Sequence, residues 1–462
     1  MLFNSIPYLL LLSFAFVFVR VFSNRKTLLL FFSLIFFCYA GFLDASIFIA
    51  TVFINWLILQ KSKTRKIGLQ LSIFFNSSLL IFFKYKSFFL LNNFDSNSGL
   101  SFISEYYPLG ISFYCFQAIG YQIDLYKGLT RGAKNLQEFL LFKSFFPQLI
   151  AGPIVRAKNL LPQIEKSNEY KIKFRLLNFG LCLLLLGLIK KVVFADSISI
   201  FVDEVFSHIP KTTQEAWIGA SLYAFQVYFD FSGYSDLALG SAYLLGFRLP
   251  INFMMPYLST SPSGFWKRWH ISLSEWIKDY IYIPLGGSKK GFLQSSLILI
   301  ITMAVAGIWH GGSINFLIWG ILWGLYIVLG RVIKINKKYS ILIWPFHMAI
   351  VLMLWVVFRA ESISQAFSFW KVMLGFGQDF SENLNESLIN APSNPDLFLY
   401  FWLMIITFFM FHILESFLRG KKLIFFLKKI RGLFINSLLL TLIFLLIMIP
   451  DFQTNPFIYF RF

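Results

Sequence analysis

The chain has 462 residues, of which 57% are hydrophobic, 20% are aromatic and only 14% are charged. This composition excludes an ordinary soluble domain, and repeated apolar runs of about 17–25 residues predict a multi-pass helical membrane protein. The formal net charge of +19 does not indicate a nucleic-acid partner, because the basic residues gather in short loops between apolar runs, as the positive-inside rule describes. The three cysteines lie in apolar surroundings without metal-ligand spacing. They are therefore interpreted as small core residues and do not indicate a disulfide framework or a metal site.

Apolar runs of membrane-spanning length recur along the whole sequence. Twelve spans are predicted, at 6–21, 28–42, 45–59, 67–91, 107–125, 177–195, 216–245, 292–308, 314–329, 341–357, 397–418 and 433–449. The first run has no basic stretch before it and no small-residue cleavage site after it. We therefore interpret it as a retained span and not as a cleaved signal.

Charged loops orient these spans. Basic loops, which favour the cytoplasmic side, lie at 61–66, 331–338 and 419–422, whereas the loop 378–396 carries four carboxylates and no Lys or Arg. Twelve crossings place all four loops on the side that their charge favours when both termini lie outside. We therefore predict that both termini are extracytoplasmic.

Two features interrupt the regular alternation of spans and loops. Lys190 and Lys191 fall in the outer half of the sixth predicted span, where they either extend to the outer interface or line a polar cavity. The segment 145–153, FFPQLIAGP, is short and apolar, with a proline near each end. Irregular backbone is tolerated at membrane depth only where protein or a cavity surrounds it, so we expect a re-entrant or broken segment here.

The segment 262–283 is predicted to be a helix that lies in the cytoplasmic membrane interface. A serine followed by Pro262 is a helix-start signal, and a step of about 100° per residue separates an apolar face from a polar face that carries Lys267 and Arg268. His270 falls within the apolar sector. A core histidine with one hydrogen bond is the simpler interpretation, but the two neighbouring cations would supply donors to an anionic cofactor.

His310 lies in the sequence GIWHGG, at the turn between the eighth and ninth predicted spans. The glycines let backbone and small ligands approach closely, and imidazole is suited to take a proton from a hydroxyl near neutral pH. The alternative is a tight glycine turn with an incidental histidine. The seventh span carries a polar belt of Asp230, Ser232, Tyr234 and Asp236, which either holds helices together or relays protons.

Five blocks occur in a fixed order: PQLIAGPIVR, FDFSGYSDLALG, NFMMPYLS, FWKRWHISLSEWIKDYIYIPLGG and GIWHGG. They resemble the membrane-bound O-acyltransferase superfamily over nearly the whole chain. The bacterial alginate O-acetylation branch is the most similar, and the D-alanyl transfer proteins of teichoic-acid modification are more distant. The resemblance implies an all-α polytopic protein of the bacterial inner membrane, with a ring of about 11–12 spans and with re-entrant and interfacial helices around a central tunnel.

The resemblance also implies roles for individual residues. It makes His310, in the WHG block, the catalytic residue, and it places His270 along the active-site tunnel. With Lys267 and Arg268, the adjacent Trp266 and Trp269 are candidates for donor binding. The implied extent is one domain over residues 1–462 with a catalytic core at about 107–330. One departure stands out, because Trp323 occupies a position where relatives often carry a further histidine.

The C-terminal tail, residues 450–462, resembles a second motif. Phe452, Phe457, Tyr459 and Phe462 follow the pattern F-x4-F-x-Y-x2-F, which is similar to the short motif whose tyrosine carries the acyl group in teichoic-acid modification. The resemblance makes Tyr459 a candidate acyl carrier. The alternative is an aromatic belt that anchors the last span at the interface.

The resemblance predicts a membrane acyltransferase that moves an acetyl group from cytoplasmic acetyl-CoA, a co-substrate and not a bound cofactor, to an extracytoplasmic polysaccharide such as alginate. An extracytoplasmic acyltransferase partner of SGNH type is expected, as are membrane lipids. D-alanyl or peptidoglycan acyl transfer is the alternative within this class. Two alternatives belong to other classes of protein, namely a proton-coupled transporter or flippase and a membrane scaffold without chemistry of its own. A scaffold would tolerate the loss of His310.

Overall fold

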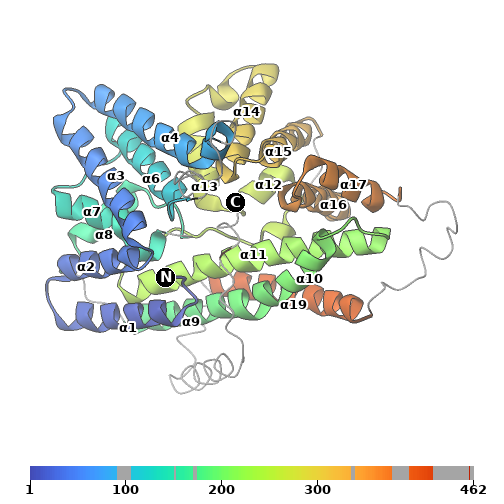
Figure 1. The fold of residues 1–462 in the computed structure, drawn as a ribbon, viewed down its shortest axis with the longest axis horizontal. Helices are drawn as coiled ribbons and strands as arrows, with labels where there is room; N and C mark the ends of the chain where they lie inside the picture. Colours follow the sequence, from blue (N-terminus) through green and yellow to red (C-terminus); the bar gives the residue numbers. More distant parts are fainter. Residues whose placement is uncertain are drawn as a thin grey trace. The chain divides into compact units, whose positions relative to one another are not determined.

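A computed structural model describes residues 1–90, 106–149, 152–169, 174–333, 339–376, 395–419 and 457 of the chain. All regular elements in this part of the chain are helices, which confirms the predicted all-α class (Figure 1). The chain divides into two compact units, each built from two stretches of sequence. The first unit comprises Met1–Gly187 and Tyr234–Ile251, and the second unit comprises Leu188–Gly233 and Asn252–Phe462.

Six helices among the described residues are long and apolar enough to cross a membrane. They are Phe42–Lys61, Arg65–Tyr85, Leu176–Phe206, Phe292–His310, Ile314–Val332 and Ser340–Arg359. Two shorter apolar helices, Ile6–Val21 and Phe401–Ile413, also coincide with predicted spans.

Not all twelve predicted crossings are reproduced. The predicted spans 28–42, 107–125 and 216–245 form helices that do not meet the same standard of length and apolarity. The first two helices have only 14 and 16 residues, and the third carries the polar belt. The predicted span 433–449 lies outside the described residues.

The helices of the first unit pack through small and polar residues as well as apolar ones. They are α1 Ile6–Val21, α2 Arg25–Cys38, α3 Phe42–Lys61, α4 Arg65–Leu90, α6 Ile111–Tyr126, α7 Leu136–Ser144, η1 Phe146–Gln148, α8 Ala157–Glu165, α9 Phe174–Leu188 and the end of α11 Thr213–Leu244. Tyr8 in α1 and Ser241 in α11 share a hydrogen bond of 2.6 Å. A Cβ on Gly240 would lie 2.7 Å from the carbonyl oxygen of Gly180, so α9 and α11 approach closely because both positions are glycine.

The predicted re-entrant segment 145–153 includes a buried, irregular stretch of the first unit. α7 ends just before it and is followed by the single turn η1, and the side chains of Phe145 and Phe146 are fully buried. The side chain of Lys143, which is also fully buried, donates a hydrogen bond of 2.5 Å to the carbonyl oxygen of Tyr114. Protein therefore surrounds this irregular backbone, as membrane burial requires.

The second unit contains the helices that follow the seventh predicted span. They are η2 Ile189–Ala195, α10 Asp196–Phe206, the beginning of α11, η3 Pro256–Leu258, α12 Pro262–Trp266, α13 Ile271–Ile277, η4 Lys278–Tyr282, η5 Gly287–Lys289, α14 Phe292–His310, α15 Ile314–Val332, α16 Ser340–Arg359, α17 Ile363–Met373 and α19 Pro395–Arg419. α14 and α15 form a tight antiparallel pair, because a Cβ on Gly307 would overlap the carbonyl of Phe316 and a Cβ on Gly320 would overlap that of Met303.

The prediction of one continuous helix over 262–283 is wrong. α12 is capped as predicted by the side chain of Ser261, but it ends after five residues. α13 begins only after His270, whose backbone has a φ of 42°, in the left-handed region. The predicted apolar face is nonetheless buried, at Phe265, Trp269, Leu273, Trp276, Ile277 and Tyr280. The burial pattern is therefore correct although the backbone is interrupted.

Candidate active site

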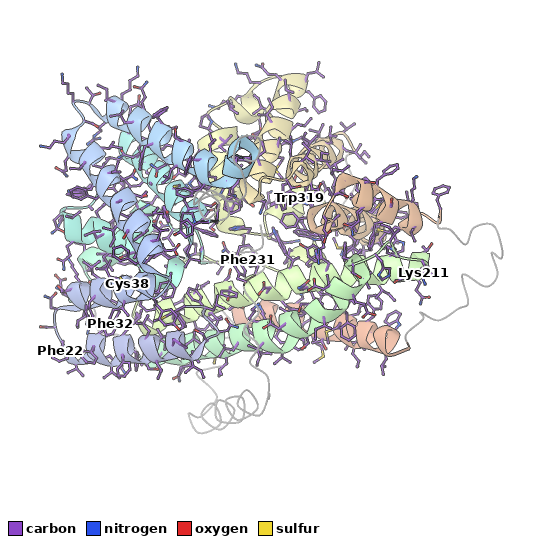
Figure 2. The ribbon with its side chains drawn as sticks, in the orientation of Figure 1. Phe22, Phe32, Cys38, Lys211, Phe231 and Trp319 are labelled. Atoms are coloured by element: carbon purple, nitrogen blue, oxygen red, sulfur yellow. The ribbon has the colours of Figure 1, made fainter. Side chains whose placement is uncertain are left out.

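His310 is the last residue of α14, where the chain turns through two glycines into α15. It is 5% exposed. Its ring centroid lies 5.2 Å from that of Trp319 in α15, with the rings at 89°, and 5.1 Å from that of Phe358 in α16 (Trp319 is labelled in Figure 2). An aromatic enclosure of this kind keeps water out and strengthens electrostatic interactions inside it.

His270 is held by hydrogen bonds of the two residues that follow it. The N–H of Ile271 donates to the carbonyl oxygen of Asn252 at 2.9 Å, and the hydroxyl of Ser272 donates to the Asn252 side chain at 2.7 Å. These bonds fix the left-handed backbone of His270, a conformation that costs energy outside glycine and often marks a functional position. This anchor was not predictable from the sequence, because Asn252 lies 18 residues before His270.

The His270 side chain is enclosed by protein and is only 1% exposed. Burial lowers its pKa to about 3, so the imidazole is neutral near pH 7. Among the described residues, neither ring nitrogen has a hydrogen-bond partner. Buried polar groups are usually satisfied, so a histidine in this state is suited to contact a ligand.

The two histidines flank the same indole. The ring centroid of Trp309 lies 6.1 Å from that of His270 and 4.9 Å from that of His310. The structure therefore places the two sequence-predicted histidines in one aromatic cluster, although 39 residues separate them in the sequence. Spacing alone gave no signal for this proximity, which only the family resemblance predicted.

A residue of the C-terminal tail reaches the same cluster. Phe457 is fully buried, and its ring centroid lies 5.6 Å from that of Phe231. Phe231, labelled in Figure 2, packs edge-on against His270, with the two ring centroids 4.6 Å apart. The tail candidates Phe452, Tyr459 and Phe462 lie outside the described residues.

The predicted donor-binding tryptophans lie in a wider aromatic layer. Trp269 is 1% exposed and lies 4.9 Å from Trp355, whereas the half-buried Trp266 lies 5.2 Å from Trp323 and 5.8 Å from Trp319, measured between ring centroids. Among the described residues, the indole N–H groups of Trp266, Trp319, Trp323 and Trp355 have no hydrogen-bond acceptor. This set of buried N–H donors was not predicted from the sequence. The high density of tryptophan in this region is the feature that could have indicated it.

The two predicted donor-binding cations lie at the helix break. Lys267 is exposed and Arg268 is half-buried. The carbonyl oxygen of Arg268 accepts a hydrogen bond of 3.0 Å from the N–H of Met254. The backbone of this segment is therefore fixed while the Lys267 ammonium remains accessible to an anion.

The predicted polar belt is buried but divided between the two units. Asp230 and Ser232 belong to the second unit, whereas Tyr234 and Asp236 belong to the first, where the Tyr234 hydroxyl donates to Asn4 at 3.2 Å. This contact joins α11 to the segment before α1, which favours the packing interpretation for this part of the belt.

The two intramembrane lysines do not extend to the surface, since Lys190 is fully buried and Lys191 is 2% exposed. The Lys191 ammonium lies 2.8 Å from a carboxylate oxygen of Asp230 and 2.8 Å from one of Asp196. The Lys190 ammonium lies 5.6 Å from the centroid of the Tyr228 ring. Both lysines sit in the π-helical segment η2, where the widened turn interrupts the regular helix.

A cavity of about 400 Å³ opens beside the turn that carries His310. Its lining includes the two glycines of that turn and the side chains of Gln226, Asn315, Arg359 and Glu361. The Asn315 amide donates to the carbonyl oxygen of Ala360 at 2.6 Å. Among the described residues, the side-chain oxygens of Gln226 and Asn315 are buried and accept no hydrogen bond. Neither residue was predicted from the sequence as part of the site.

Comparison with known proteins places this arrangement in a family. The model of MBOAT, the membrane-bound O-acyltransferase family, matches residues 131–360. The probable alginate O-acetylase of Pseudomonas fluorescens is 41% identical over 61% of this chain and 57% of that protein. The probable alginate O-acetylase of Pseudomonas putida is 38% identical over 72% of this chain and 69% of that protein. The peptidoglycan O-acetyltransferase of Helicobacter pylori is 35% identical over 71% of each chain. The chain therefore belongs to the membrane-bound O-acyltransferase family, and acyl transfer is its class of chemistry.

Proposed function

We propose that the protein transfers an acetyl group from acetyl-CoA on the cytoplasmic side to an extracytoplasmic acceptor that leads to a polysaccharide. The observation that carries this proposal is the pair of buried histidines around Trp309, next to a cavity lined by polar side chains. The names of the relatives support acetyl as the group and a cell-surface polymer, alginate or peptidoglycan, as the destination.

His310 acts as the general base in this proposal. It takes the proton from the acceptor hydroxyl while the hydroxyl oxygen attacks the thioester carbonyl, and the C–S bond then breaks. The thiolate of coenzyme A receives the proton back from His310, so the step is balanced without a further reactant. His270 remains neutral near pH 7 and positions the thioester by a hydrogen bond.

The cavity beside His310 would receive the acceptor. The buried side-chain oxygens of Gln226 and Asn315 need donors, and a hydroxyl-bearing acceptor supplies them. The side chain of Arg359 is oriented by an ion pair of 2.7 Å with Asp203. A polymer chain is too large for a cavity of about 400 Å³, so a small carrier group must enter in its place.

Tyr459 is the proposed carrier. Phe457 is buried next to Phe231, one ring away from His270, and this supports a tail that returns to the site. A phenol has a pKa near 10, which makes it easier to deprotonate than serine, and its ester is an activated donor. An extracytoplasmic acyltransferase partner, of SGNH type, would then move the acetyl group to the polymer.

The test uses purified full-length protein in lipid nanodiscs with radiolabelled acetyl-CoA. The His310→Ala variant should lose labelling of the protein or of an acceptor by at least about 10²-fold, because general-base catalysis contributes about 10²–10⁴-fold. His208→Ala, which removes an exposed histidine, serves as the matched control and should keep full activity. Normal transfer by a folded His310→Ala protein would overturn the proposed mechanism.

The same samples test the carrier. Mass spectrometry of the C-terminal peptide should find an acetyl group on Tyr459 in the wild type. A Tyr459→Phe variant retains the aromatic ring and should lose the label together with transfer to the acceptor. An active Tyr459→Phe enzyme would leave the His310 chemistry in place but would exclude the relay.

A further inference from the structure

The first unit contains a second cavity, of about 440 Å³, which is built from three separate segments of the chain. Its cationic side chains are Arg25 at the start of α2, Lys166 just after α8 and Arg248 in the loop after α11. Among the described residues that line it, none is acidic. This cavity belongs to a different compact unit from His270 and His310.

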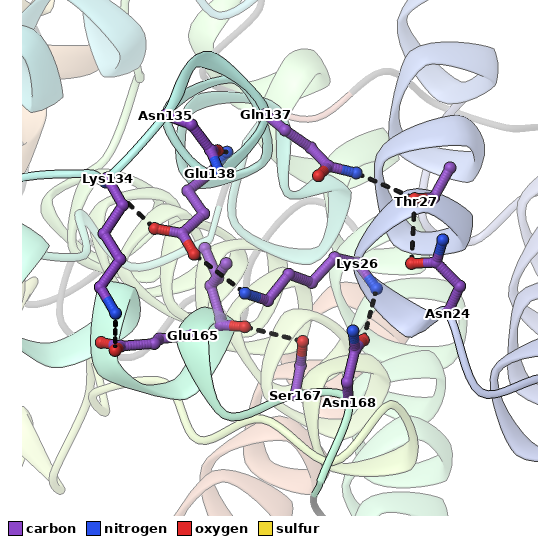
Figure 3. Close-up of polar contacts among 11 residues, drawn as sticks. Asn24, Lys26, Thr27, Lys134, Asn135, Gln137, Glu138, Glu165, Ser167 and Asn168 are labelled. Atoms are coloured by element: carbon purple, nitrogen blue, oxygen red, sulfur yellow. Dashed lines mark hydrogen bonds and ion pairs between the residues drawn. The ribbon is translucent and has the colours of Figure 1, made fainter.

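Two carboxylates close to these segments are paired with other lysines. Glu138 accepts a hydrogen bond of 2.9 Å from the Lys26 ammonium, and Glu165 forms an ion pair with Lys134 (Figure 3). Within the described part of the chain, Lys166 makes no ion pair. The described lining of the cavity therefore carries three cationic side chains and no carboxylate.

Hydrogen bonds hold the three segments in place. The Gln163 side chain donates to the carbonyl oxygen of Arg248 at 3.0 Å and accepts from its N–H at 2.8 Å. The Arg25 guanidinium donates to the carbonyl oxygen of Ser167 at 3.3 Å. The N–H of Lys26 donates to the side chain of Asn168 at 3.2 Å (Figure 3). The backbone of the cavity is thus fixed, so binding a ligand does not require the segments to assemble.

The lining combines these cations with buried apolar side chains, among them Leu29 and Phe247. Arg and Lys together favour phosphate, because guanidinium groups make paired charge-assisted hydrogen bonds and ammonium groups supply a point charge. The volume falls within the roughly 300–1,000 Å³ that is usual for small-molecule sites.

We propose that this cavity binds the phosphoryl group of an amphiphilic phosphate ester. The loop charge bias predicts that this face is cytoplasmic. Two sources of the same chemistry are present there, namely the headgroup of an anionic phospholipid and the phosphates of a soluble ester such as coenzyme A. The experiment below distinguishes them.

The test compares a Lys166→Gln, Arg248→Gln double variant with a control that loses the same charge elsewhere, Lys63→Gln with Lys158→Gln. All four side chains are exposed, and neither control residue lines the cavity. Full-length protein in detergent is titrated with phosphatidylglycerol, with dioleoylglycerol as the phosphate-free lipid, and with coenzyme A and pantetheine as the soluble pair. Native mass spectrometry and thermal shift report binding.

The phosphate-bearing member of at least one pair should bind more tightly than its phosphate-free counterpart. Its Kd should rise at least about tenfold in the cavity variant and stay unchanged in the control variant. A loss confined to phosphatidylglycerol assigns a lipid headgroup, whereas a loss confined to coenzyme A assigns a soluble ester. Equal effects of the two variants, or no preference for the phosphate-bearing ligands in the wild type, would overturn the proposal.

Discussion

At the scale of single residues, the environment of His310 contains a hydrogen-bond donor without an acceptor. Trp319 lies 5.2 Å from His310 between ring centroids, and within the described residues its buried indole N–H has no acceptor. When an acyl carbonyl is attacked, negative charge develops on its oxygen, and a fixed donor stabilises that charge. Trp319 is therefore a candidate to hold the carbonyl oxygen during transfer.

We predict that Trp319→Phe keeps the aromatic packing but lowers kcat at least about tenfold, because one donor to a developing oxyanion is removed. Trp323→Phe is the matched control. Its indole also lacks an acceptor among the described residues, but its ring stacks on Phe265 at 5.1 Å. Acetyl transfer rates of the two variants in nanodiscs measure the difference. Equal rates would assign Trp319 to packing alone.

Residue chemistry was only partly predictable from the sequence. The position of His310 at a glycine turn was predictable from the sequence GIWHGG, but the helical count around His270 assumed a regular backbone. That assumption failed because the chain is held before the break by Met254 and after it by Asn252. Contacts between distant residues of this kind leave no periodic signal. The proximity of the two histidines came from the family resemblance, not from their spacing.

At the scale of helices, the apolar runs were predictable because membrane burial imposes both their length and their composition. The first predicted span coincides with α1, Ile6–Val21, where a serine cap and a proline begin the helix. The π-helical segment η2 was not predictable from the apolar pattern; Lys191 within it forms ion pairs with Asp196 and Asp230. Neither the break before α13 nor the widened turn of η2 interrupts the apolar pattern that predicted the helices.

The α14–α15 pair yields a prediction about stability. A Cβ on Gly320 would overlap the backbone of Met303, and neither backbone can move without separating the helices. Gly320→Ala should therefore destabilise the protein by about 1–3 kcal/mol, the usual cost of overpacking. Gly291→Ala is the control, because a Cβ there meets no atom within 4 Å. Thermal unfolding in detergent compares them, and equal midpoints would show that the pair can separate without cost.

At the scale of the whole molecule, native cysteines offer a test of the predicted orientation. Cys38 is exposed at the end of α2, whereas Cys115 is buried. With both termini outside, Cys38 faces the exterior, so an impermeant maleimide should label it in intact cells. In a Cys38→Ser background, Ser62→Cys should be labelled only after the membrane is opened. Labelling of Ser62→Cys in intact cells would show that the predicted orientation is inverted.

The division into two units also bears on how the chain is made. Each unit joins two stretches of sequence, and the first needs residues up to Ile251 while the second needs Leu188 onward. The ribosome adds about 5–20 residues per second. The last stretch of the first unit is therefore synthesised several seconds after the rest of that unit, and the start of the second unit is made in between. Early spans must therefore remain in the membrane without their final partners during translation. We expect that a chain truncated between residues 188 and 233 leaves the first unit unfinished and exposed to quality-control proteases.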